Sequence, residues 1–228
     1  MRFQMRVLLF ALLLAPLAGA AQTQDALFNL VSLNAQAERE VANDLLTATL
    51  AAETEGADPA QVADGVNRSM QRALAAALAY KSVKAQSAGY QTLPVYEKNR
   101  VARWRVRQEL RLESADFAAA TELIGKLQAS LLVTGLGLSV SAETRRKAEN
   151  ALIAEALAAF DERARVVRDA MKAKGYRVKD LHIAPGGAPP RPVPMLARGL
   201  SSDAVSQPAI EPGSTRIVIS VSGTLQLQ

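Results

Sequence analysis

Arginines and glutamates alternate with apolar residues along one segment of this sequence and form its densest set of charged side chains. Apolar residues between them fall on the opposite face, which is typical of an antiparallel strand with one face in water. Cross-strand ion pairs are the favoured interpretation of the charged face. The alternative is a contact with an anion or a partner, such as lipid headgroup phosphates or a neighbouring subunit. The charged members are Arg103, Arg105, Arg107, Glu109, Arg111 and Glu113.

Two pairs of carboxylates have the spacing that acid–base chemistry or a hard cation would need. Glu38 and Glu40, and likewise Glu53 and Glu55, lie two residues apart, so each pair shares one face if its segment is a strand. Solvated strand faces contain the same residues, and no apolar pocket is indicated that would shift their pKa values. A carboxylate-dependent hydrolase is therefore the least favoured function. Asp44 receives no role.

The remaining chemical candidates are weaker. His182 is the single histidine, and a lone histidine builds neither a metal cage nor a catalytic triad without partners. Gly135 and Gly137 lack the third glycine of a dinucleotide fingerprint, so close packing within a sheet is favoured. The cysteine count is zero. We therefore expect no catalytic residue, no cofactor and no metal, and a protein that is not an enzyme.

Residues 1–20 have the pattern of a secretory signal peptide. Arg2 and Arg6 precede the apolar run Val7–Leu17, and Ala18–Ala20 supplies small residues for cleavage. The run is too short to span a membrane comfortably. We expect a soluble periplasmic protein that begins at Ala21 or Gln22.

Composition limits the partners. Without Arg2 and Arg6 the formal charge falls from +5 to +3, which is too mild for a nucleic-acid footprint. Only five Phe, four Tyr and one Trp occur, so platforms for stacking bases or sugars are few. The chain is long enough to bury a core without disulfides.

Hydrophobic periodicity predicts an α+β fold, a mostly antiparallel sheet with helices on one face. Predicted strands cover 27–37, 44–54, 82–95, 101–113, 131–140, 176–184 and 215–228, and predicted helices cover 59–78, 114–128 and 142–174. Ser114 and Ser141 are candidate N-caps for the last two helices, and Gly175 is a candidate C′ residue. The helix at 142–174 is the longest. Residues 21–228 form one domain that could divide into lobes of about 21–113 and 114–228.

The segment Pro185–Gly213 interrupts this pattern. It holds seven of the ten prolines, which predicts a long loop that is sensitive to protease. The loop is either inert or crosses a neighbouring subunit.

Four strings in order give the chain a resemblance to the SIMPL-domain family of bacterial periplasmic and outer-membrane-associated proteins. One is the N-terminal strand pair, and the others are TLPVYEKNRVARWRVRQELRLESADF, AENALIAEALAAFDERARVVRDAMKAKGYRV and IEPGSTRIVISVSGTLQLQ. The resemblance runs from about Phe28 to Leu227. Arg103-Trp104-Arg105 departs from it, because the family often has Gly-Tyr there.

The resemblance implies an α+β protein that forms homo-oligomers, in some members large rings, with links to immunogenicity and to envelope or oxidative stress. It carries no catalytic residue to this chain. The leading hypothesis is a non-enzymatic, exported, oligomeric envelope protein in envelope maintenance or stress tolerance, with outer-membrane association as a further expectation. The alternative is a periplasmic binding module for a small ligand or lipid.

Overall fold

The computed structural model describes residues 28–186 and 211–228. The signal peptide predicted at 1–20 and most of the predicted loop lie outside these residues. In chain order the elements are β1 (Leu30–Ala42), β2 (Leu45–Gly56), α1 (Pro59–Ala77), β3 (Lys84–Glu97), β4 (Arg100–Ser114), α2 (Phe117–Leu127), β5 (Leu132–Ser139), α3 (Ala142–Ala170), β6 (Tyr176–Gly186) and β7 (Ser214–Leu227).

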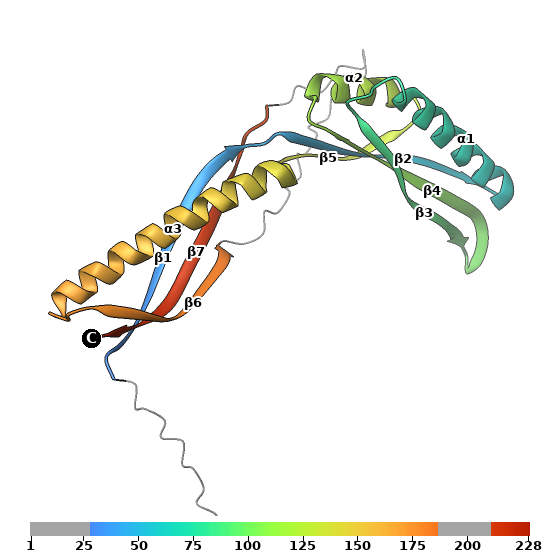
Figure 1. Cartoon of the computed structure of the whole chain (residues 1–228). Coiled ribbons are helices and arrows are strands. Elements are labelled where there is room, and N and C mark those ends of the chain that lie inside the picture. The colour runs from blue at the N-terminus through green and yellow to red at the C-terminus, as the bar shows by residue number, and fades with distance from the viewer. Residues whose placement is uncertain (1–27, 187–210) are drawn as a thin grey trace, which may run out of the picture.

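The fold is α+β, as predicted, but the described strands form two antiparallel sheets (Figure 1). One has the order β3-β4-β2-β5 and the other the order β1-β7-β6. Helices α1 and α2 pack on the first sheet, and α3 packs on the second. Each sheet has its own hydrophobic core.

The core of the four-stranded sheet forms because α1 and β2 present apolar residues at the periods of a helix and a strand. Asp58 caps α1 by accepting a hydrogen bond from the backbone N–H of Ala60, and Pro59 occupies the first turn. Val62, Val66 and Met70 of the helix are buried. They belong to the same core as buried residues of β2 and β4, among them Leu46, Leu50, Val106, Leu110 and Leu112.

The core of the three-stranded sheet rests on β7, its central strand. Ile217, Ile219, Val221 and Leu225 are buried in alternation with more exposed neighbours, as the sequence pattern predicts. The facing stripe of α3 recurs every four residues, at Ala148, Leu152, Ala156, Phe160 and Ala164. Because four residues exceed one helical turn of 3.6, this stripe moves around the helix by about 40° per repeat as it crosses the sheet.

The sheets divide the chain differently from the lobe boundary suggested at 113/114. Residues 45–139 supply β2 to β5 with α1 and α2, whereas β1 joins β6 and β7 in the other sheet. The four-stranded unit is thus an insertion between β1 and α3. Local periodicity does not reveal this, because it depends on the pairing of β1 with β7, whose registered residues lie more than 170 positions apart.

Two predicted helix ends are wrong. Asp116, not Ser114, is the N-cap of α2, with its side chain accepting from Ala119 N–H. Ser114 is buried and donates instead to the carbonyl of Ser82, at 2.7 Å. Helix α3 ends at Ala170, and Lys172 rather than Gly175 takes the left-handed conformation after it. Strand β6 also runs on through Pro185 and Gly186, which were expected to begin the loop.

Candidate functional site

The charged face predicted at 103–113 lies on the helix-free side of the four-stranded sheet. Antiparallel pairing of β2 with β4 sets Glu53 opposite Arg107 and Glu55 opposite Arg105. Residues directly opposite in such a pair project to the same face. The carboxylate pair Glu53/Glu55 and the arginine face, which the sequence presented as separate features, are therefore one site.

Most of these side chains join into a run of linked ion pairs from Glu97 to Glu109, and Arg111 and Glu113 form a separate pair on the same strand. We call the whole set the arginine–glutamate ladder. Arg105 Nε donates to Glu55 Oε1 at 2.6 Å, and Arg107 reaches Glu53 at 3.3 Å and Glu109 at 2.9 Å. Arg103 donates to Glu97 at 3.0 Å, and Arg111 lies 2.9 Å from Glu113. The members of the ladder are Arg103, Arg105, Arg107, Arg111, Glu53, Glu55, Glu97, Glu109 and Glu113.

Charge pairing in the ladder raises the pKa values of two of its arginines. The hydrogen bond to Glu55, aided by its charge, raises the pKa of Arg105 above its usual range. The hydrogen bond to Glu109 does the same for the pKa of Arg107, with Glu53 adding to it. Four arginines meet five glutamates, so the ladder as a whole carries no excess positive charge. A free anion would have to displace the glutamates to bind there.

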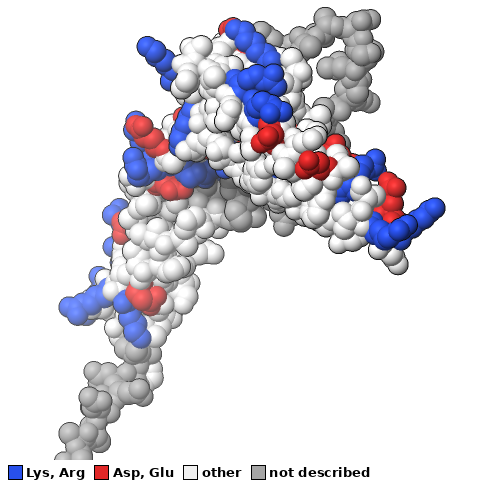
Figure 2. Space-filling view, turned by 90° about the vertical axis from the view of Figure 1, so that its right-hand side faces the viewer, with Lys and Arg blue, Asp and Glu red and all other residues white. Residues whose placement is uncertain are grey.

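Figure 2 shows one side of the molecule, where basic and acidic side chains lie in small groups between wide uncharged areas. The second carboxylate pair is also placed against a cation. Glu38 and Glu40 on β1 each lie 3.8 Å from Arg216 of β7. Both pairs thus resemble solvated strand faces more than acid–base dyads.

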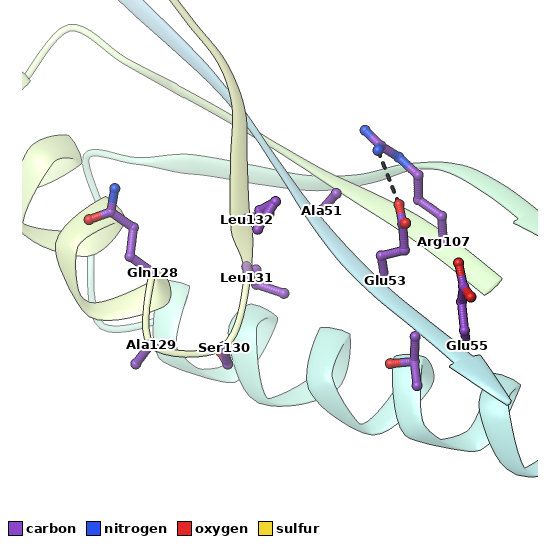
Figure 3. Close-up of a pocket in the computed structure, with 10 residues that line it drawn as sticks. Ala51, Glu53, Glu55, Arg107, Gln128, Ala129, Ser130, Leu131 and Leu132 are labelled. Atoms are coloured by element: carbon purple, nitrogen blue, oxygen red, sulfur yellow. Dashed lines mark hydrogen bonds and ion pairs between the residues drawn. The ribbon is translucent and has the colours of Figure 1, made fainter. Parts of the chain in front are cut away.

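A pocket of about 430 Å³ opens beside the ladder (Figure 3). Glu53, Glu55 and Arg107 line one side, and Gln128 and Ser130 of the turn before β5 line the other. Ala51, Leu131 and Leu132 lie between them. This combination of a small apolar floor and a few polar groups could bind a small polar molecule.

The other sequence candidates lie apart from the ladder. His182 is exposed on β6, in the other sheet, opposite Ser222. Gly135 and Gly137 lie within β5 and not at a strand-to-helix turn. Residues 28–186 and 211–228 contain no cluster of three or more potential metal ligands.

Asp44 is the residue that sequence reasoning missed. It lies between β1 and β2, where the chain passes from one sheet to the other, and accepts hydrogen bonds from Ser141 and Thr144 at the start of α3. Burial opposes its ionisation, but these hydrogen bonds outweigh burial and hold the pKa of Asp44 below its usual value. The available signal was an acidic residue at the start of the predicted strand 44–54, and its role depends on Ser141, which lies 97 positions away.

Comparisons with known proteins place the chain in a family without giving it an activity. No curated protein matches the sequence. Among the described helices none is long and apolar enough to cross a membrane. The SIMPL family, described as a protein of unknown function (DUF541), matches residues 31–225, which include both sheets and all three described helices. The chain therefore belongs to the SIMPL (DUF541) family.

Proposed function

We propose that this protein is a non-enzymatic, exported component of the cell envelope that acts as a homo-oligomer in envelope maintenance or tolerance of oxidative stress. Family membership and the signal-peptide pattern at 1–20 support the proposal.

One structural observation supports the proposal of a homo-oligomer. Large apolar side chains are exposed on strands at the sheet edges: Leu132 of β5 is 67% exposed, and Val178 of β6 is 50% exposed. Leu181 and Ile183 of β6 are also exposed. Open edges with apolar side chains invite pairing with another chain. Assembly would bury these residues and remove the aggregation hazard.

The ladder supports a structural role for the charged face. The carboxylates of Glu53 and Glu55 each form ion pairs with arginines of the neighbouring strand, which is the arrangement of a cross-strand network of charged side chains. Surface pairs of this kind fix the register of neighbouring strands and contribute modestly to stability. If the ladder has a partner, one with alternating charges fits it better than a lipid phosphate alone.

Three measurements on the full chain test the proposal. Periplasmic fractionation with N-terminal sequencing should find protein that begins at Ala21 or Gln22. Light scattering after size-exclusion chromatography should give a mass that is a multiple of the protomer's. A deletion strain should lose viability under peroxide or detergent relative to the complemented strain. A monomer of full-length mature protein, or a deletion strain that is as resistant as its parent, would contradict the corresponding part.

The pocket beside the ladder favours a second candidate, a periplasmic binding module for a small ligand. Its volume lies within the range of small-molecule sites. Native mass spectrometry of freshly purified protein should then show an added mass. Replacing Ser130, whose turn lines the pocket, by Trp should remove that mass without changing the oligomeric state.

A further inference from the structure

The two sheets expose four edge strands in the described residues, and these differ in how they discourage pairing. Strand β1 carries Glu38, Arg39 and Glu40, and β6 carries Lys179, Asp180 and Pro185. Strand β3 has Lys84, Pro94 and two irregularities in its register. Charges, prolines and bulges of this kind are the usual means of blocking edge-to-edge association.

Strand β5 lacks most of this protection. The whole stretch 127–142 contains no charged residue and no proline, and its irregularity is a single register shift against β2. One side of β5 pairs with β2, and β5 ends the sheet order. Its other side therefore presents a run of backbone donors and acceptors without a strand beside them in the described residues.

The side chains of β5 are also incompletely covered. Leu136 and Leu138 lie opposite Ala48 and Leu46, on the side of the sheet that carries the helices. With Val133 they pack against the core but remain only partly buried. Leu132 lies opposite Ala51, on the other side of the sheet, and is 67% exposed. An added strand would cover the row formed by Val133, Leu136 and Leu138 and would pair the unpaired backbone groups of β5.

We propose that β5 pairs antiparallel with β5 of a second copy of this chain, joining two four-stranded sheets into one continuous sheet. The proposal rests on the homo-oligomer proposed above and names the surface that forms it. A two-fold axis perpendicular to the sheet keeps the helices of both copies on one side of the joined sheet. The apolar row of one copy then lies beside the same row of the other copy.

The absence of charge on β5 favours a second copy of this chain as its partner and favours β5 over the other edge strands. Two copies of an uncharged strand meet without repulsion, whereas self-pairing of β1 would bring its charged residues together. Pairing of unlike edges, such as β5 with β6, would produce a head-to-tail assembly, in which cysteines placed on β5 would not meet one another.

Cysteine cross-linking tests the pairing directly, because the chain contains no cysteine. Thr134→Cys, Gly135→Cys and Gly137→Cys each place one thiol on β5. A Cβ at Gly135 meets only Thr49 at 3.9 Å, and one at Gly137 meets nothing within 4 Å, so these variants should fold. Under mild oxidation at least one should run as a disulfide-linked dimer, because residues near a two-fold axis meet their own copies. Ala88→Cys on the opposite edge should stay monomeric on the same gel. Absence of cross-linking in all three β5 variants would overturn the proposal.

A charge block gives the second readout. Leu132→Lys with Gly137→Lys should at least halve the mass measured by light scattering. The reason is that each lysine adds a positive charge to both copies of β5, so that the two strands repel each other. The matched control adds the same charge to β3 as Ser87→Lys with Ala88→Lys and should keep the wild-type mass. Circular dichroism establishes that both variants are folded. If the β5 variant keeps the wild-type mass, this pairing is wrong while the oligomer stands. If the wild-type protein is itself a monomer, both proposals fail.

Discussion

At the scale of single residues, Asp44 and its neighbour Asn43 tie together segments that are distant in the sequence. Asp44 Oδ1 accepts from the backbone N–H of Ser141 at 2.5 Å, and Oδ2 accepts from the Ser141 hydroxyl at 2.8 Å. Asn43 donates to the carbonyl of Pro212 at 2.7 Å and accepts from Thr215 at 2.6 Å. The start of α3 and the start of β7 are therefore both anchored where the chain leaves β1.

Removing the Asp44 carboxylate should destabilise the protein in a pH-dependent way. Asp44→Ala should cost about 2 kcal/mol at neutral pH, because hydrogen bonds to a charged acceptor are lost. The folded pKa of Asp44 lies below its ordinary value of 3.8, so its contribution is complete above that value and is lost as the pH falls through the folded pKa.

The Asp44→Asn variant isolates this dependence. Urea denaturation between neutral pH and pH 3 should show a smaller acid-induced loss of stability in Asp44→Asn than in the wild-type protein. Other carboxylates titrate equally in both proteins, so the difference between the two curves belongs to Asp44. Parallel curves would show that Asp44 makes no charge-dependent contribution.

The ladder makes a separate prediction about specific pairing. Reversing Arg105 and Arg107 to Glu should lower the melting temperature by a few degrees but leave the fold intact, because both side chains are partly exposed. The reversal sets glutamates opposite Glu55 and Glu53. Adding Glu53→Arg and Glu55→Arg should recover most of the loss by swapping the pairs. If the fourfold variant melts no higher than the double variant, the pairs contribute through packing rather than charge.

At the scale of elements, much of the fold is predictable because one face of each strand is buried. The alternation in β7 and the apolar side of β4 at Val106, Leu110 and Leu112 were predicted and are buried. Helix ends were predicted less well. Ser114 and Asp116 are both good capping residues, and the choice between them depends on the Ser82 carbonyl, which arrives from a distant turn.

The candidate site was predictable only in part for a similar reason. Alternation identified the arginines and the carboxylate pair Glu53/Glu55 separately, but their union requires the register of β2 against β4. Nothing in the local sequence specifies that register. The role of Asp44 likewise depends on a hydrogen bond to Ser141, 97 residues away.

The buried face of β7 should not tolerate charge. Ile219 and Val221 are 3% and 0% exposed and pack in the core beneath α3. Changing both to Asp places two charges where no partner lies, which costs more than a marginally stable fold can supply. We expect no soluble, folded protein from this double variant. Ser222→Asp lies on the exposed side of the same strand and should express and melt like the wild-type protein. Soluble, cooperative unfolding of the double variant would contradict the observed register of β7.

At the scale of the whole molecule, the four-stranded unit is a contiguous insertion whose ends lie close together. The backbone N–H of Asp44 donates to the carbonyl of Ser139 at 3.1 Å, so the unit begins and ends at one point. Close ends let one compact unit be inserted into another without distorting either. The two cores share no residue.

Separate cores predict two cooperative units with distinct stabilities. Leu50 is fully buried in the core of the four-stranded sheet, and Leu152 is fully buried beneath α3. Each change to Ala should cost about 2–5 kcal/mol through lost contacts and a residual cavity. Calorimetry should then show Leu50→Ala lowering one transition and Leu152→Ala lowering the other, with the unaffected transition serving as the internal control.

A fragment of residues 44–140 should fold alone, because its core draws on residues 46–138. It should melt at the temperature of the transition that Leu50→Ala lowers. A single transition that both substitutions shift equally, or an unfolded fragment, would mean that the contacts around Asp44 couple the two units into one.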